Sequence, residues 1–130
     1  MSLPLADLGF VMLIDDSKVD NFINTKVFEL SKRTQAIQVF DNAQKALLFL
    51  QTTEKVPNFI FLDIYMPYMD GFDFLEEFEK LPSTVKDTAK VMLLSSSFDT
   101  LEAERLKKYS WVYGYLVKPL THESLNFDTE

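Results

Sequence analysis

Residues 58–67 read NFIFLDIYMP, and the turn-forming pair Asp70-Gly71 follows shortly after them. The apolar run from Phe59 to Leu62 is unbroken and has no helical spacing, which is typical of a strand buried on both faces of a sheet. The run ends at Asp63, and the residues after it favour a loop. The segment therefore predicts a buried strand with a carboxylate at its carboxyl end, where open α/β sheets hold their ligands.

The composition is that of one globular domain without a surface for nucleic acid. The chain has 130 residues, 47% of them hydrophobic, a net charge of −7 and no cysteine. Nucleic acids and anionic membranes bind clustered Lys and Arg, which this balance of charge disfavours. The apolar run at 10–14 is too short for a signal peptide or a membrane span. We therefore expect a cytoplasmic protein with an N-terminal extension (1–8) and one domain (9–130) that binds neither nucleic acid nor membrane.

Short apolar runs and helical periodicities alternate along the whole chain. The pattern predicts strands at 10–14, 36–40, 59–63, 91–94 and 112–117, and helices at 17–32, 42–56, 72–81, 99–109 and from 121 onward. Residues 83–88 are expected to form a polar connection, and Asp99 with Glu102 has the spacing of a capping box. Repeated strand-helix units predict a parallel sheet covered by helices on both faces, a three-layer α/β sandwich.

Residues of chemical interest follow four of the five predicted strands. They are Asp15 and Asp16 after the first, Asp63 after the third, Ser95 after the fourth and Lys118 after the fifth. Each has an ordinary explanation when taken alone, such as a helix cap, a turn residue or a surface lysine. In a parallel sheet, however, all these strand ends lie on one edge, so the side chains are expected to converge on one pocket.

The charges of this set indicate the chemistry that the pocket can carry. Carboxylates about 5 Å apart repel one another by about 3 kcal/mol per pair at an effective dielectric constant near 20, so the acids require a cation. Oxygen ligands suit Mg²⁺ or Mn²⁺. With Lys118 and the Ser95 hydroxyl nearby, such a site would stabilise a phosphoryl group during in-line transfer to Asp63 as nucleophile.

Taken together, these features resemble the receiver domains of two-component response regulators. The resemblance covers about residues 9 to 127, and the residues that carry it are Asp15-Asp16, the segment FLDIYMPYMDG at 61–71, Ser95, Tyr115 and Lys118-Pro119. It implies a flavodoxin-like fold with a five-stranded parallel sheet in the order 2-1-3-4-5 and five helices. It also implies a cis peptide bond between Lys118 and Pro119.

The resemblance further implies the role of each residue in the pocket. Asp63 would accept a phosphoryl group from a histidine kinase or a phosphotransfer protein, and Lys118 would contact that group. Asp15, Asp16, Asp63 and the backbone carbonyl of Tyr65 would bind Mg²⁺. The chain would then be a signalling phosphoacceptor that catalyses only its own phosphotransfer and autodephosphorylation, and no other enzyme reaction.

Ser95 and Tyr115 would form the conformational switch of such a domain. A phosphoryl group on Asp63 can accept a hydrogen bond from Ser95, which draws the hydroxyl inward and opens space for Tyr115 to rotate. The surface of the helix at 99–109, the strand at 112–117 and the last helix would change and bind a downstream protein. The phosphate lifetime should depend on the side chains of Tyr65 and of Ser97 or Phe98.

The sequence departs from the family pattern in three places. Ser95 stands where Thr is commoner, the segment from Ser95 to Lys118 is one residue longer than in chemotaxis-type receivers, and the last helix is short and ends in Asp-Thr-Glu at 128–130. The chain is therefore either a stand-alone receiver or a piece of a longer regulator or hybrid kinase.

Two other functions compete with this interpretation. A phosphatase of the haloacid dehalogenase type also uses an aspartate at a strand end, but it would need a second Asp where Tyr65 stands. A phosphorylation-independent interaction module would not need the acidic set.

Overall fold

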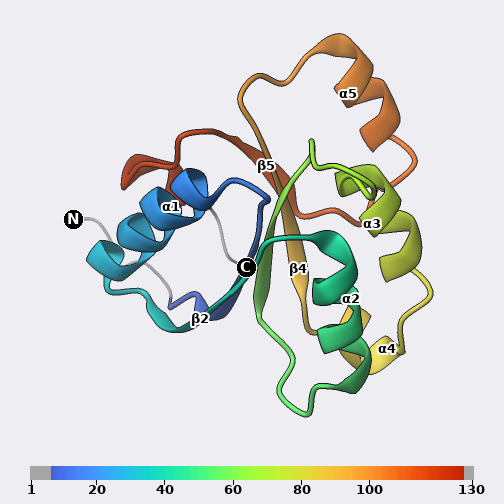
Figure 1. The fold of residues 1–130 in the computed structure, drawn as a ribbon, viewed down its shortest axis with the longest axis horizontal. Coiled ribbons are helices and arrows are strands. Elements are labelled where there is room, and N and C mark those ends of the chain that lie inside the picture. Colours follow the sequence, from blue (N-terminus) through green and yellow to red (C-terminus); the bar gives the residue numbers. More distant parts are fainter. Residues whose placement is uncertain (1–6, 128–130) are drawn as a thin grey trace.

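The computed structural model describes residues 7–127, in which strands and helices alternate along the chain (Figure 1). The strands are β1 (Gly9–Ile14), β2 (Thr34–Phe40), β3 (Phe59–Asp63), β4 (Lys90–Ser95) and β5 (Gly114–Val117). The helices are α1 (Lys18–Ser31), α2 (Ala43–Thr52), α3 (Gly71–Phe78), α4 (Ser83–Lys86) and α5 (Thr100–Leu106), and the 3-10 turn η1 (Glu123–Leu125) follows β5.

The five strands form one parallel sheet in the order β2-β1-β3-β4-β5, which confirms the order that the resemblance implied. Every residue of β3 is buried, whereas β2 at the edge is half-exposed. The register pairs Ile14 with Leu62. Because Asp15 and Asp63 each come next in sequence, the two carboxylates leave β1 and β3 at the same level of the sheet.

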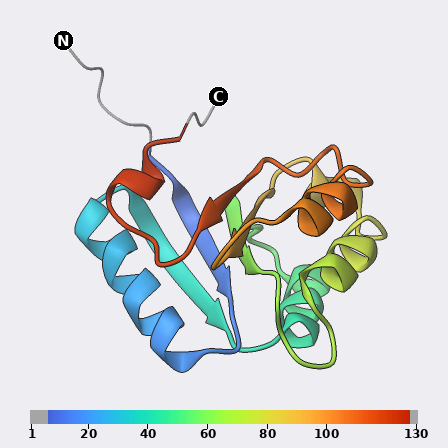
Figure 2. The same cartoon turned by 90° about the horizontal axis from the view of Figure 1, so that it is seen from above.

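Each face of the sheet has its own hydrophobic core. One core lies under α2, α3 and the segment after α5, where Ile60, Phe74 and Tyr109 are buried. The other lies under α1 and the C-terminal segment, where Phe28 packs on Phe61 with ring centroids 4.8 Å apart. Figures 1 and 2 show the same division, with α1 on one side of the sheet and α2, α3 and α5 on the other. The three-layer α/β sandwich is thereby confirmed.

Polar side chains fix the first turns of the helices that follow the strands. The Ser17 hydroxyl accepts a hydrogen bond from the Asp20 N–H at the start of α1. Asn42 caps α2 in the same way, and Asp70 forms a capping box at α3. The capping box predicted for Asp99 is present at α5. These caps satisfy amides that a helix end leaves without partners, and they fix where each of these helices begins.

Two of the predicted elements were wrong. Residues 83–86 form the short helix α4 instead of a polar connection, because Val85 is buried in the core and the turn of helix brings it there. The predicted last helix is only the 3-10 turn η1 within the described residues, because Leu125 is its one buried side chain. Residues 7–127 contain five α-helices, the number expected, but the set differs. The predicted acidic end at 128–130 and most of the predicted extension lie outside the described residues.

Within residues 7–127, no helix is both long enough and apolar enough to cross a membrane.

Candidate functional site

The carboxyl ends of the strands surround a pocket of about 450 Å³. Its lining residues are Asp15, Asp16, Ser17, Asp20, Asp63, Tyr65, Ser96, Lys118 and Pro119. Six of the residues singled out in the sequence are in this set: the three acids, Tyr65, Lys118 and Pro119. Residues that are up to 103 positions apart in the chain therefore meet at one edge of the sheet.

The three predicted acids lie close enough to share one cation. Asp15 and Asp63 are buried, Asp16 is exposed, and one carboxylate oxygen from each lies within 4.8 Å of the others. A set of carboxylate oxygens with one side open to water is typical of sites for hard divalent ions such as Mg²⁺ or Mn²⁺. The donor atoms present here therefore fit a divalent metal.

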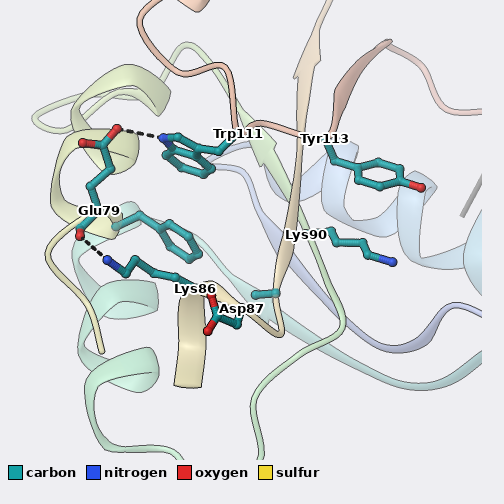
Figure 3. A pocket seen from close by; sticks show the side chains of 8 residues that line it. Glu79, Lys86, Asp87, Lys90, Trp111 and Tyr113 are labelled. Carbon is teal, nitrogen blue, oxygen red and sulfur yellow. Dashed lines mark hydrogen bonds between the residues drawn. The ribbon is translucent and has the colours of Figure 1, made fainter. Parts of the chain in front are cut away.

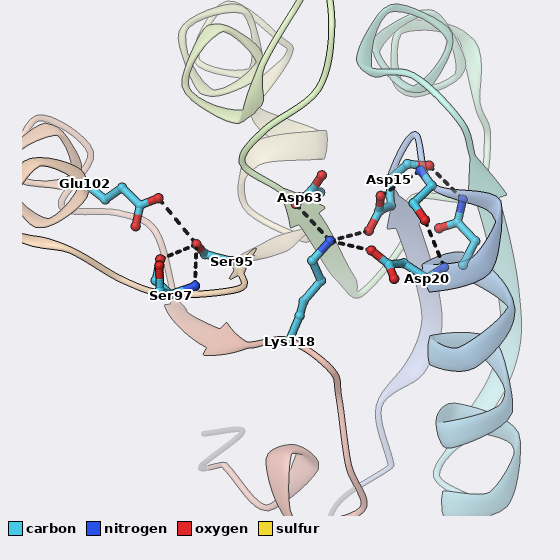
Figure 4. Close-up of polar contacts among 9 residues, drawn as sticks. Asp15, Asp20, Asp63, Ser95, Ser97, Glu102 and Lys118 are labelled. Carbon is cyan, nitrogen blue, oxygen red and sulfur yellow. Dashed lines mark hydrogen bonds and ion pairs between the residues drawn. The ribbon is translucent and has the colours of Figure 1, made fainter.

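The ammonium group of Lys118 lies between the carboxylates (Figure 4). Its Nζ atom is 2.9 Å from Oδ2 of Asp15 and 3.2 Å from Oδ1 of Asp63. The backbone places it there, because the Lys118 N–H donates to the carbonyl of Ser95 over 2.7 Å. The peptide bond between Lys118 and Pro119 is cis, as the resemblance implied.

Asp20 is a fourth acid of the site, and the pattern of residues at the strand ends does not reveal it. Its Oδ2 atom is 2.9 Å from Nζ of Lys118. Asp20 lies in the first turn of α1, where an acid is already explained by the helix dipole. The available signal was its position three residues after Ser17, whose side chain caps the helix and also lines the pocket.

Burial and a neighbouring negative charge raise the pKa of Asp63 above that of an ordinary carboxyl group. Removal from water, and then the negative charge of Asp15, raise the pKa of Asp63 to about 6, although Lys118 acts in the opposite direction. Burial lowers the pKa of Lys118, but hydrogen bonds to Asp20 and Asp15 and the charges of Asp63 and Asp15 outweigh it, so the pKa of Lys118 is raised overall. The pocket thus carries excess negative charge that one ammonium does not neutralise.

Ser95 lies at the end of β4, but its hydroxyl is directed away from Asp63 (Figure 4). The side chain is buried and hydrogen-bonds to the carbonyl of Ser97. It also lies 3.3 Å from Oε1 of Glu102. Ser95 is therefore beside the pocket without lining it.

Tyr115 lies on β5, and its side chain is 48% exposed. Its ring stacks on Phe98 with centroids 3.9 Å apart and planes at 11°. The predicted switch residues thus occupy neighbouring strands. The Ser95 hydroxyl is buried and directed away from Asp63, and the Tyr115 ring lies at the surface.

Glu102 is a second residue whose place in the site was not anticipated. Its capping role was predicted, but its carboxylate is also buried and faces the hydroxyl groups of Ser95 and Tyr65. The hydrogen bond to Glu102 is the main reason that the pKa of Tyr65 is raised to about 12. Strand and helix patterns carry no signal for such a contact, because it depends on how α5 is rotated against the sheet.

Gly71 allows the loop after β3 to turn back closely on the backbone of Ile64. Its N–H donates to the carbonyl of Ile64 over 2.7 Å. A Cβ atom at this position would lie 2.8 Å from Cα of Ile64, which is closer than backbone atoms tolerate. The Asp70-Gly71 pair therefore ends the loop and starts α3 in one tight turn.

A larger pocket, of about 540 Å³, lies at the opposite edge of the sheet, where β4 and β5 begin (Figure 3). Glu79 accepts hydrogen bonds there from Nε1 of Trp111 through its carboxylate and from Nζ of Lys86 through its carbonyl. None of the predicted site residues lines this pocket. We therefore assign the chemistry to the acidic pocket.

Comparisons with known proteins agree with this geometry. The family model for the response regulator receiver domain matches residues 11–127. The crystal structure of a two-component response regulator from Cytophaga hutchinsonii has 32% sequence identity and a TM-score of 0.82, with 92% of each chain covered. The Probable C4-dicarboxylate response regulator DctR of Halalkalibacterium halodurans is 28% identical over 88% of this chain. The protein-glutamate methylesterase/protein-glutamine glutaminase of Treponema denticola is 30% identical over 92% of this chain.

The matched region is a part of the two curated relatives. This chain spans 47% of the length of the first and 31% of the length of the second. The likeness therefore concerns the domain that they share with this chain.

Proposed function

Because this chain belongs to the response regulator receiver domain family of two-component systems, we propose that Asp63 accepts a phosphoryl group from a histidine kinase or a phosphotransfer protein. One observation carries the proposal. A carboxylate at the end of the central strand shares a pocket with two further acids and with a lysine ammonium 3.2 Å away. This is the arrangement that in-line phosphoryl transfer to a carboxylate requires.

The transfer uses a carboxylate oxygen of Asp63 as the nucleophile. That oxygen attacks phosphorus, a P–O bond forms, and the P–N bond to the donor imidazole breaks with its electron pair going to the ring nitrogen. Lys118 pairs with an oxygen of the arriving group. Asp15, Asp16, Asp63 and the carbonyl of Tyr65 would hold Mg²⁺ or Mn²⁺, which when bound neutralises charge on the phosphoryl oxygens.

Phosphorylation would then change the surface through Ser95 and Tyr115. The Ser95 hydroxyl turns toward the phosphoryl group, and Tyr115 leaves Phe98 to occupy the space that the hydroxyl vacates. The surface of α5, β5 and η1 is thereby altered and binds a downstream protein. In this proposal the chain is a signalling phosphoacceptor, and its reactions are its own phosphorylation and dephosphorylation.

The decisive experiment is labelling with a radioactive small phosphodonor such as acetyl phosphate. We expect label on the parent chain in Mg²⁺, loss of label in excess chelator, and loss of label in Asp63→Asn. Asp87→Asn is the matched control, because Asp87 is an exposed carboxylate that lines the pocket at the opposite edge of the sheet, and it should label as the parent does. Equal labelling of the parent and Asp63→Asn would refute the proposal.

A further inference from the structure

We infer that Glu102 is a positioning residue that holds the Ser95 hydroxyl away from Asp63 until the phosphoryl group arrives, an inference that rests on the function proposed above. Three donors surround its carboxylate: the Asp99 N–H 3.1 Å from Oε2, the Ser95 hydroxyl 3.3 Å from Oε1, and the hydroxyl of Tyr65. They come from three segments of the chain, the start of α5, the end of β4 and the loop after β3. Glu102 therefore connects α5 to the rim of the pocket.

The capping box explains only one of these contacts. A glutamate in this role accepts a hydrogen bond from the amide at the start of its own helix, and it does not need to be buried to do so. Glu102 is only 3% exposed. Its burial and its two hydroxyl partners therefore call for another explanation.

The carboxylate depends on these donors because no cation neutralises it. Among the ion pairs of residues 7–127, none involves Glu102, and Arg105 one turn further along α5 pairs instead with Asp70. A buried acceptor that loses a donor keeps the cost of its removal from water. Loss of the Ser95 hydroxyl as a donor would therefore raise the free energy of the buried Glu102 carboxylate.

The Ser95 hydroxyl has a single proton, so its possible acceptors compete. In the structure the carbonyl of Ser97 is the nearer acceptor, 2.5 Å from Oγ of Ser95, and the carboxylate of Glu102 is the second, 3.3 Å away. A phosphoryl group on Asp63 would have to draw the proton from both. Glu102, together with the Ser97 carbonyl, thus contributes to how strongly the resting orientation opposes the phosphorylated one.

The same competition reaches the surface that is expected to change. Residues 96–99 connect Ser95 to α5, and they include Phe98, on which Tyr115 stacks. When the hydroxyl leaves Glu102, the first turn of α5 loses one of its attachments to the sheet. Release of Glu102 and movement of Tyr115 are therefore parts of one change.

The test compares the affinity of the chain for beryllofluoride, a mimic of the acyl phosphate, in Mg²⁺ by NMR titration. Glu102→Gln keeps the length and a capping oxygen but removes the charge, so its hydrogen bond to Ser95 is weaker. We expect it to bind beryllofluoride about fivefold more tightly than the parent, which corresponds to about 1 kcal/mol. In a Ser95→Ala background the same substitution should have no effect.

Asp99→Ala is the control for the capping box, because the Asp99 side chain accepts from the Glu102 N–H over 2.8 Å but is not a partner of Ser95. It should lower the melting temperature and leave the beryllofluoride affinity unchanged. If Glu102→Gln does not fold, Glu102→Asp, which withdraws the carboxylate from Ser95 while keeping its charge, should show the gain instead.

The outcomes distinguish failure of the proposed function from failure of the role inferred for Glu102. A parent chain that binds no beryllofluoride in Mg²⁺ would refute the proposed function. A parent that binds it while the Glu102 variants bind equally or more weakly would overturn the role of Glu102 alone. An equal gain in Asp99→Ala, or a gain that persists without Ser95, would also overturn that role.

Discussion

Replacing Asp63 with Asn should stabilise the metal-free fold at neutral pH and have little effect in acid. Burial and Asp15 raise the pKa of Asp63 from 3.8 to about 6, so the ionised form is less favourable in the fold than in the unfolded chain. The difference corresponds to about 3 kcal/mol. It is absent below about pH 3, where the carboxyl group is protonated in both states, and it is complete above about pH 7, where the group is ionised in both. Asparagine is neutral throughout.

Urea unfolding in excess chelator at several pH values measures this difference. We expect the gain in unfolding free energy of Asp63→Asn over the parent to grow by about 2 kcal/mol between pH 4.5 and 7.5. Asp87→Asn, which removes an exposed carboxylate, should stay within about 0.5 kcal/mol of the parent at every pH. Saturating Mg²⁺ should reduce the advantage of Asp63→Asn, because the cation stabilises the parent through Asp63. A gain that does not depend on pH, or a less stable Asp63→Asn at pH 7.5, would refute this electrostatic account.

Two further predictions concern the loop after β3. Tyr68 has a φ of 69° and is fully exposed, so Tyr68→Gly should relieve backbone strain and raise the unfolding free energy by up to about 1 kcal/mol, with Tyr68→Ala as the control that keeps the strain. Gly71→Ala should lower the unfolding free energy by about 1–3 kcal/mol, because its Cβ would meet the backbone at Ile64. Thermal unfolding followed by circular dichroism measures both, and a Gly71→Ala chain as stable as the parent would contradict the close approach seen there.

The positions of the strand-end carboxylates could be predicted because they depend on little more than burial. The runs before Asp15 and Asp63 are apolar throughout, and a parallel sheet brings their ends together. The order of the strands could not be predicted from the residues alone. Residues 10–14, 59–62 and 91–94 are all apolar throughout, so periodicity does not say which of these strands lies at the centre of the sheet, and the order came from the resemblance.

The remaining features depend on tertiary packing that sequence patterns do not encode. Asp20 belongs to the pocket because of the direction in which α1 runs away from the pocket. In the sequence, an acid in the first turn of a helix has the same pattern whether or not it has a partner. The helix at 83–86 is shorter than the period that would reveal it, and only Val85 anchors it. Thr121 hydrogen-bonds to Ser124 as a cap would, but the apolar spacing needed to continue the helix is missing.

The short strand β5 lies at one margin of the sheet that residues 7–127 form. It pairs only with β4, through four residue pairs, and the last of these joins Ser95 to Val117. The last residue pair between these two strands therefore lies directly before Lys118 in the chain. In the proposed function, a shift at Ser95 would pass along this single row of residue pairs to Tyr115, while the hydrogen bonds among β2, β1, β3 and β4 stay intact. Phosphorylation would in this way change the surface without disrupting the buried centre of the sheet.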